Sequence, residues 1–168
     1  MKFNYKIFII LISLFFLKIT DLSAQSKKPI NFLNKKAPEL NIETWISEKP
    51  ELQNKFILID FWATWCTPCK VAMKHLNDFQ KLYKDELAII GLSHETPEKI
   101  RKMKYPVISY YSASDTQERL KKELNIKAIP YVIVIDPKGI IRWQGNPLRK
   151  DDVLDEYKLE DLFKKYND

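Results

Sequence analysis

The stretch FILIDFWATWCTPC, residues 56–69, decides the fold of this chain. Its first six residues are apolar except for Asp60, which predicts a central strand buried on both faces. Two cysteines follow closely, and Pro68 between them fits the first turn of a helix. A Cys-x-x-Cys pair where a buried strand leads into a helix suits reversible dithiol–disulfide chemistry, because the helix N-terminus stabilises a thiolate. Cys66 and Cys69 are therefore the candidate catalytic residues.

Other roles for the cysteine pair are less well supported. The chain has two cysteines in all, so the pair cannot belong to a framework of structural disulfides. A bridge between residues three apart closes almost no loop and would add little stability. Zinc usually takes four ligands, and the chain's histidines are His75 and His94. His75 lies about 9 Å beyond Cys69 along the predicted helix. Three scattered glycines give no phosphate-binding loop. We expect neither a metal nor a cofactor.

The first residues of the chain have the pattern of a secretory signal peptide. Lys2 and Lys6 precede an apolar run at 7–17, and small residues up to Ala24 follow. The run is shorter than the roughly 20 residues needed to span a bilayer. Residues 1–24 therefore predict export to a periplasmic or other extracytoplasmic space, with cleavage after Ala24. An uncleaved membrane anchor is the alternative.

The remaining residues are enough for one domain and too few for two typical ones. Residues 25–37 are mostly polar and lysine-rich, which predicts a flexible lead-in to a domain at 38–168. The full chain has a formal net charge of +6, spread along its length. No basic stripe is interleaved with aromatic residues, so nucleic-acid binding is not expected.

Strand-like and helix-like segments alternate along the rest of the sequence. The turn DPKG at 136–139 favours a type I turn between two apolar runs, which predicts a β-hairpin. We expect strands at 56–61, 87–92, 107–111, 131–135 and 140–143, and helices at 68–83, 97–104, 116–124 and 159–166. This order predicts an α/β fold with a mostly parallel central sheet, an antiparallel hairpin at one side and helices on both faces. We expect Tyr110, Tyr111 and Tyr131 to pack in the core or at the sheet edge.

Residues 57–70 resemble the active-site strand and helix of the thioredoxin superfamily. Ile129-Pro130-Tyr131 is similar to the cis-proline loop of that superfamily. The interval before Pro130 leaves room for an extra βα unit beyond plain thioredoxin. Together with the predicted signal peptide and the APEL segment at 37–40, this extra unit makes the chain resemble the TlpA/ResA-like exported thiol-disulfide oxidoreductases. The resemblance covers about residues 36–166.

The resemblance also bears on an acid in the predicted strand. ResA-like members carry a glutamate three residues after the second cysteine, where this chain has Ala72. Asp60 instead matches the buried acid of thioredoxin. Because Asp60 interrupts an apolar strand, we expect burial, and desolvation would raise its pKa. It could accept the proton of Cys69, directly or through a water, as that thiol attacks. A structural acid hydrogen-bonded in the core is the alternative.

The resemblance implies roles for the cysteines and for a groove beside them. Cys66, nearer the solvent and the helix start, attacks a substrate disulfide as a thiolate, and Cys69 resolves the mixed disulfide. Pro130 in the cis form shapes the groove, and Ile129 offers backbone groups to an extended substrate strand. The expected groove residues are Trp65, Thr67, Pro68, Ile129 and Pro130.

The residues between the cysteines bear on the direction of electron transfer. Thr67 and Pro68 are closer to thioredoxin than to strongly oxidising relatives, which favour a histidine there. The resemblance therefore implies a reductant of exported protein disulfides, with apocytochrome c as a candidate substrate and a membrane electron donor as its partner. An oxidase or isomerase is the first alternative. A non-catalytic module that uses the groove to bind partners is the second.

Overall fold

The computed structural model describes residues 30–167. The predicted signal peptide at 1–24 and the first part of the predicted lead-in, 25–29, lie outside the described residues. The described part of the lead-in runs along strand β6 (Ile141–Gly145), where the backbone N–H of Asn34 donates to the carbonyl of Ile141 at 2.8 Å. Among the helices of the described residues, none is both long and apolar enough to cross a membrane.

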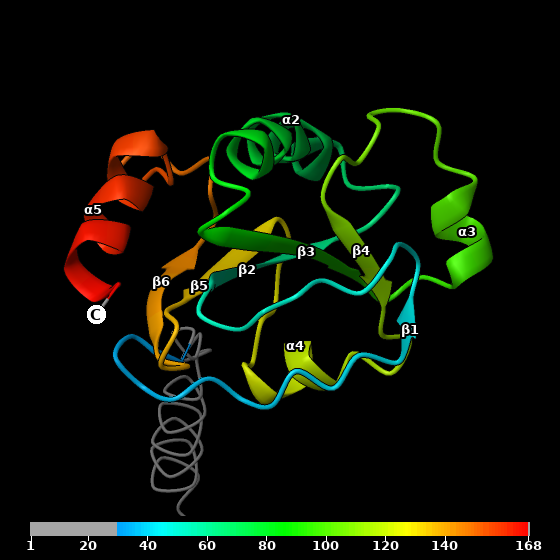
Figure 1. Cartoon of the computed structure of the whole chain (residues 1–168). Helices are drawn as coiled ribbons and strands as arrows, with labels where there is room; N and C mark the ends of the chain where they lie inside the picture. The colour runs from blue at the N-terminus through cyan, green and yellow to red at the C-terminus, as the bar shows by residue number, and fades with distance from the viewer. Residues whose placement is uncertain (1–29, 168) are drawn as a thin grey trace, which may run out of the picture.

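A six-stranded mixed sheet lies at the centre of the domain, in the order β1-β4-β3-β2-β5-β6 (Figure 1). The other strands are β1 (Thr44–Trp45), β2 (Phe56–Trp62), β3 (Leu87–Ser93), β4 (Tyr111–Ser114) and β5 (Tyr131–Ile135). β2, β3 and β4 pair in parallel, whereas β1, β5 and β6 join through antiparallel pairings. The expected hairpin is confirmed as β5–β6. The antiparallel part is larger than expected, because β5 also pairs antiparallel with β2 and the short β1 adds a second antiparallel edge.

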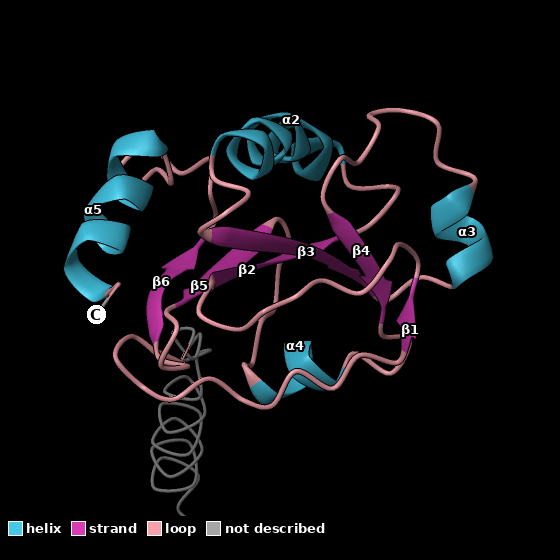
Figure 2. Cartoon of the chain, viewed as in Figure 1, coloured by secondary structure: helices cyan, strands magenta, loops and turns pink. Residues whose placement is uncertain are grey.

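Helices cover both faces of the sheet, as expected (Figure 2). They are α2 (Thr67–Leu82), α3 (Pro97–Arg101), α4 (Arg119–Glu123) and α5 (Glu156–Tyr166). Leu76 of α2, Ile100 of α3 and Phe163 of α5 share one core cluster. Leu120 of α4 belongs to a second cluster on the opposite face.

Alternation along β2 decides which side chains face α2. Leu58 and Trp62 belong to the cluster shared with α2, and Ile59 and Phe61 belong to the cluster shared with α4. Successive side chains of a strand point to opposite faces, so Asp60 faces the same side as Leu58 and Trp62. Because β2 leads into the start of α2, this register places an acid below the residues that open the helix.

The segment before β4 differs most from the sequence-based expectation. A strand at 107–111 was wrong, because β4 covers Tyr111–Ser114. Asn77 of α2 bonds the preceding loop instead: its amide donates to the carbonyl of Val107 at 2.8 Å and accepts from the N–H of Ser109 at 2.7 Å. These bonds occupy backbone groups that strand pairing would have used, and Val107 remains 69% exposed.

The expected βα unit before Pro130 is present, since α3, β4 and α4 lie between β3 and β5. α3 and α4 are each five residues long, shorter than the expected helices at 97–104 and 116–124. α4 begins only after Glu118, whose φ of 54° is left-handed and not helical. α5 begins earlier than the expected 159, because Asp155 caps it by accepting from the N–H of Lys158.

Candidate active site

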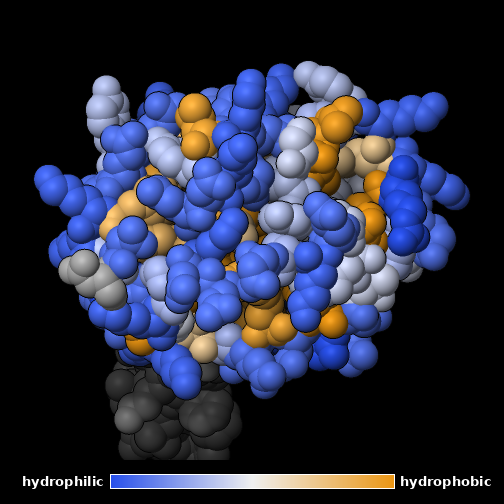
Figure 3. Space-filling model, in the orientation of Figure 1, coloured by the Kyte–Doolittle hydropathy of each residue, from blue (hydrophilic) through white to orange (hydrophobic). Residues whose placement is uncertain are grey.

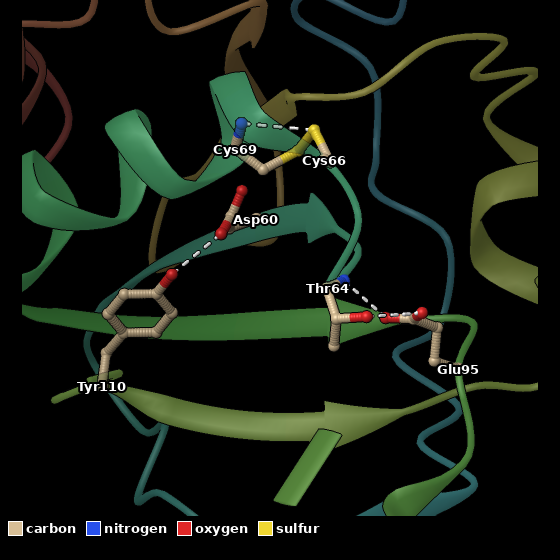
Figure 4. Close-up of a disulfide and its surroundings, with 6 residues drawn as sticks. All are labelled: Asp60, Thr64, Cys66, Cys69, Glu95 and Tyr110. Carbon is tan, nitrogen blue, oxygen red and sulfur yellow. Dashed lines mark hydrogen bonds between the residues drawn. A yellow bond between two sulfur atoms is a disulfide. The ribbon is translucent and has the colours of Figure 1, made fainter. Parts of the chain in front are cut away.

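The two cysteines form a disulfide at the N-terminus of α2 (Figure 4). Cys66 is the N-cap of this helix, and its Sγ accepts a hydrogen bond from the backbone N–H of Cys69 at 3.2 Å. Cys66 keeps 3% of its surface exposed, whereas Cys69 is 0% exposed. Cys66 is therefore the more exposed of the two, as expected for the attacking cysteine, and the roles of the pair stay a prediction.

The start of α2 favours negative charge on Cys66. Unpaired backbone N–H groups and the helix dipole place partial positive charge at this end. The first turn of α2 contains no acidic residue, and Lys70 lies half-buried just beyond Cys69. These charges favour the thiolate form of a reduced Cys66, which is the form that attacks a disulfide.

Asp60 lies buried between the disulfide and Tyr110 (Figure 4). Its Oδ2 accepts a hydrogen bond from the Tyr110 hydroxyl at 2.9 Å, and no donor among residues 30–167 pairs with its Oδ1. Burial raises the pKa of Asp60 to about 7, and the Tyr110 bond lowers it by less. A carboxyl with this pKa can accept or release a proton near neutral pH, as a general base must. Its part in catalysis stays a prediction.

The groove residues expected from the sequence come from two parts of the chain. Trp65 precedes the N-cap of α2 and Thr67 and Pro68 open its first turn, whereas Ile129 and Pro130 precede β5, which pairs with β2. Trp65 is 63% exposed, whereas Trp62 is buried in the core. Ile129 packs against the core cluster that contains both cysteines, and the Ile129–Pro130 peptide bond is cis, as the resemblance implies. The arrangement leaves an aromatic surface beside Cys66, and its use by a substrate stays a prediction.

A buried carboxylate holds the loop that precedes Cys66. Glu95 is 5% exposed, and its two oxygens accept from the N–H of Thr64 at 2.5 Å and from the Thr64 hydroxyl at 2.9 Å (Figure 4). Lys99, one helical turn farther on, forms an ion pair with Glu95 at 2.6 Å. Burial alone would raise the pKa of Glu95, but the hydrogen bonds from Lys99 and Thr64 outweigh burial and lower it. Glu95 therefore stays ionised and anchors the connection between β2 and α2.

Glu95→Ala should destabilise the fold by roughly 2–3 kcal/mol at pH 7, because the N–H of Thr64 loses its partner in a part-buried position. Urea unfolding of the oxidised protein measures the change. Glu123→Ala is the matched control, since the Glu123 side chain is exposed and forms no hydrogen bond or ion pair with another described residue. The pKa of Glu95 is lowered in the fold, so its contribution is present at neutral pH and should disappear as the pH falls through that lowered pKa. Equal effects of the two substitutions would contradict the anchoring role.

A family model described as thioredoxin-like matches residues 54–141. The chain belongs to the thioredoxin-like family. The matched residues include β2, the cysteine pair and the Ile129–Pro130 bond, so the match contains the site described above. The resemblance stated from the sequence is confirmed.

Relatives of this thioredoxin-like chain include named oxidoreductases. Thioredoxin-like protein YneN of Bacillus subtilis is 30% identical over 125 residues, which are 70% of this chain and 74% of that protein. Thiol-disulfide oxidoreductase ResA of Bacillus cereus is 27% identical over 143 residues, which are 79% of this chain and 80% of that protein. The structure of a thiol-disulfide oxidoreductase from Bacteroides fragilis matches with a TM-score of 0.54 and 25% identity, over 67% of this chain and 82% of that one.

His94 of this thioredoxin-like chain lies beside Trp65. Its ring meets the Trp65 ring edge-on, with 6.4 Å between centroids, and its Nδ1 lies 3.9 Å from a carboxylate oxygen of Glu118. His75 lies exposed on α2. Within residues 30–167, no three or more His, Cys, Asp or Glu side chains are grouped so that they could hold a metal ion.

Tyr110 and Glu95 are the site residues that sequence reasoning missed. Tyr110 was expected only to pack, and its hydroxyl bonds Asp60 across 50 positions of the chain. Glu95 did carry a usable signal: it follows a buried strand at the carboxyl edge of the sheet, where the sites of α/β folds gather.

Proposed function

We propose that this protein is a thiol-disulfide oxidoreductase that reduces disulfides of extracytoplasmic proteins. The observation that carries the proposal is the Cys66–Cys69 disulfide at the start of α2, with Cys66 as the N-cap. This placement gives one sulfur contact with solvent and a favoured thiolate, and it keeps the second sulfur buried within bonding distance. Membership of the thioredoxin-like family and relatives named thiol-disulfide oxidoreductase support it.

The reaction begins from the reduced pair. The thiolate of Cys66 attacks one sulfur of a substrate disulfide, and a Cys66–substrate disulfide forms. The other substrate sulfur leaves as a thiolate and takes a proton from solvent. The substrate is at this point half reduced and covalently held.

Resolution uses Cys69 and Asp60. Cys69 gives its proton to Asp60 and attacks the Sγ of Cys66, so the mixed disulfide breaks and the Cys66–Cys69 disulfide forms. The second substrate sulfur leaves as a thiolate and is protonated. The substrate has gained two electrons, the cysteine pair has lost two, and Asp60 returns its proton to solvent before the next cycle.

The groove supplies the means to hold a protein substrate. Exposed Trp65 offers apolar surface beside Cys66, and the backbone at Ile129 can pair with an extended substrate segment. We propose disulfides of exported proteins as the substrates, those of apocytochrome c among them. The pattern of residues 1–24 supports export, and a reductant outside the cytoplasm needs a membrane electron donor to restore its dithiol.

The reduction potential of residues 25–168 tests the direction of electron transfer. A value near or below about −250 mV is expected for a reductant, because thioredoxin-like reductants lie in that range. The measurement is equilibration against defined thiol/disulfide buffers, followed by acid quenching and counting of free thiols. A value of roughly −120 to −180 mV would make the protein an oxidase or isomerase and would overturn the reductant proposal.

A further inference from the structure

Tyr110 contacts the general-base candidate directly. It lies between α3 and β4, just before β4, and it is 4% exposed. Its hydroxyl donates to Oδ2 of Asp60 at 2.9 Å, and Figure 4 shows the other carboxylate oxygen pointing toward the cysteine pair. No donor among the described residues pairs with that second oxygen, Oδ1. Tyr110 therefore occupies one side of the carboxylate and leaves the side that faces Cys69 open.

A glycine in the neighbouring strand β3 leaves space for the Tyr110 ring beside Asp60. Gly91 of β3 is the register partner of Asp60. A Cβ at Gly91 would lie 2.9 Å from Cε2 of Tyr110, closer than real Cβ atoms approach, and 3.0 Å from Nε1 of Trp62, which is tighter than most real contacts. The Tyr110 ring thus occupies the space that a side chain at position 91 would fill. The bond to Asp60 depends on that glycine as well as on the tyrosine.

The hydrogen bond from Tyr110 partly offsets the effect of burial on the charge of Asp60. Burial, followed by the neighbouring Asp60 charge, raises the pKa of Tyr110 well above its usual 10, so the phenol stays a hydrogen-bond donor. A donor to a carboxylate stabilises the ionised form, which opposes the effect of burial on Asp60. Without the hydroxyl, a larger share of Asp60 would be protonated at neutral pH, and a protonated carboxyl cannot accept a proton.

We propose that Tyr110 is a positioning residue for disulfide exchange, which turns Oδ1 of Asp60 toward Cys69 and keeps that carboxylate able to accept the cysteine's proton. This inference rests on the proposed function, because it assigns a partner to the base in the resolution step. Tyr110 does not touch the reacting sulfurs in this role. It acts through Asp60.

The other groups around Asp60 leave Tyr110 as the main adjustable contact. From α2 the facing group is Cys69, which does not titrate in the disulfide, and from β3 and β5 the register partners are Gly91 and Val132, which do not titrate. Among the described residues, the causes that shift the pKa of Asp60 are burial and the Tyr110 bond. A change at Tyr110 should therefore appear as a change in the titration of Asp60.

Tyr110→Phe removes one oxygen and keeps the ring, so it tests the bond without emptying the core. The pKa of Asp60 should rise by about one unit in this variant. Resolution of the mixed disulfide should then slow about fivefold at pH 7 and recover at pH 9, because the pH–rate profile moves up with the pKa. Tyr111→Phe is the matched control: Tyr111 is adjacent, packs against the opposite core cluster and should leave the profile unchanged.

Two measurements keep the inference separate from the proposed function. The ¹³C titration of the Asp60 carboxyl in the oxidised protein reports on Tyr110 whether or not the protein reduces disulfides. The pH–rate profile, repeated in an Asp60→Asn background where Tyr110→Phe should no longer displace it, reports on the use of the carboxyl. An unchanged Asp60 pKa, or an equal loss of rate at every pH, would overturn the positioning role. Absence of disulfide reduction by the unmodified protein would instead overturn the proposed function.

Discussion

Cys69→Ser should convert this protein into a covalent trap, whereas Cys66→Ser should leave it unreactive toward disulfides. In Cys69→Ser the reduced Cys66 still attacks, but no second sulfur is present to resolve the mixed disulfide. Turnover of a disulfide-containing protein should fall at least about a thousandfold in either variant, because each removes a group that forms a covalent bond in the cycle. Both variants should therefore lose turnover, but only Cys69→Ser should form a covalent adduct with the substrate.

Non-reducing electrophoresis and intact-mass spectrometry detect that adduct. Reduced Cys69→Ser mixed with a disulfide-containing protein should gain the mass of one substrate, and dithiothreitol should release it. Cys66→Ser serves as the control, since it changes the same atom at the other position of the pair. Partners retained by both variants without any covalent adduct would indicate a non-catalytic binding module and would sink the enzyme proposal.

The strand–cysteine–helix unit was predictable because its determinants lie close together in the sequence. The apolar run of β2, its single acid and the proline in the first turn each act within a few residues of one another. The burial of Asp60 follows from the same local pattern, because both faces of this strand are covered and neither side-chain direction leads to solvent. Alternation along the strand then fixes the face on which the acid lies.

The contacts that complete the site were not predictable, because they join distant parts of the chain. Tyr110 reaches Asp60 only through the packing of β4's preceding loop over Gly91. Glu95 reaches Thr64 only because β3 lies parallel beside β2, with their carboxyl ends at the same edge. Nothing in the residues adjacent to these side chains specifies such partners.

The loop before β4 shows how a tertiary contact overrides a local pattern. Val107 and Ile108 have the composition of a strand, but the amide of Asn77 occupies the backbone groups at Val107 and Ser109. Pairing with β3 begins only at Tyr111. The apolar pattern therefore predicted the existence of this strand but placed its start about four residues too early.

Asp60→Asn should make the oxidised protein more stable by roughly 2–4 kcal/mol at pH 8. Burial raises the pKa of Asp60 from 3.8 to about 7. Between these values the native state holds a proton that the unfolded chain has released, so stability falls as the pH rises. Each pKa unit corresponds to about 1.4 kcal/mol, and asparagine, which cannot ionise, avoids the whole penalty.

Urea unfolding at pH 4, 6 and 8 measures this difference and tests whether the buried charge of Asp60 lowers the stability of the fold. The gain should be small at pH 4, where the native carboxyl is protonated, and should grow toward pH 8. Asp78→Asn, at an exposed position of α2, should give the same small difference at every pH. Destabilisation by Asp60→Asn at every pH would contradict this prediction, because the loss of the hydrogen bond to Tyr110 would then outweigh the cost of burying the charge. The same burial that makes the charge of Asp60 unfavourable gives the carboxyl a pKa of about 7, which suits the proton transfer from Cys69 that we propose.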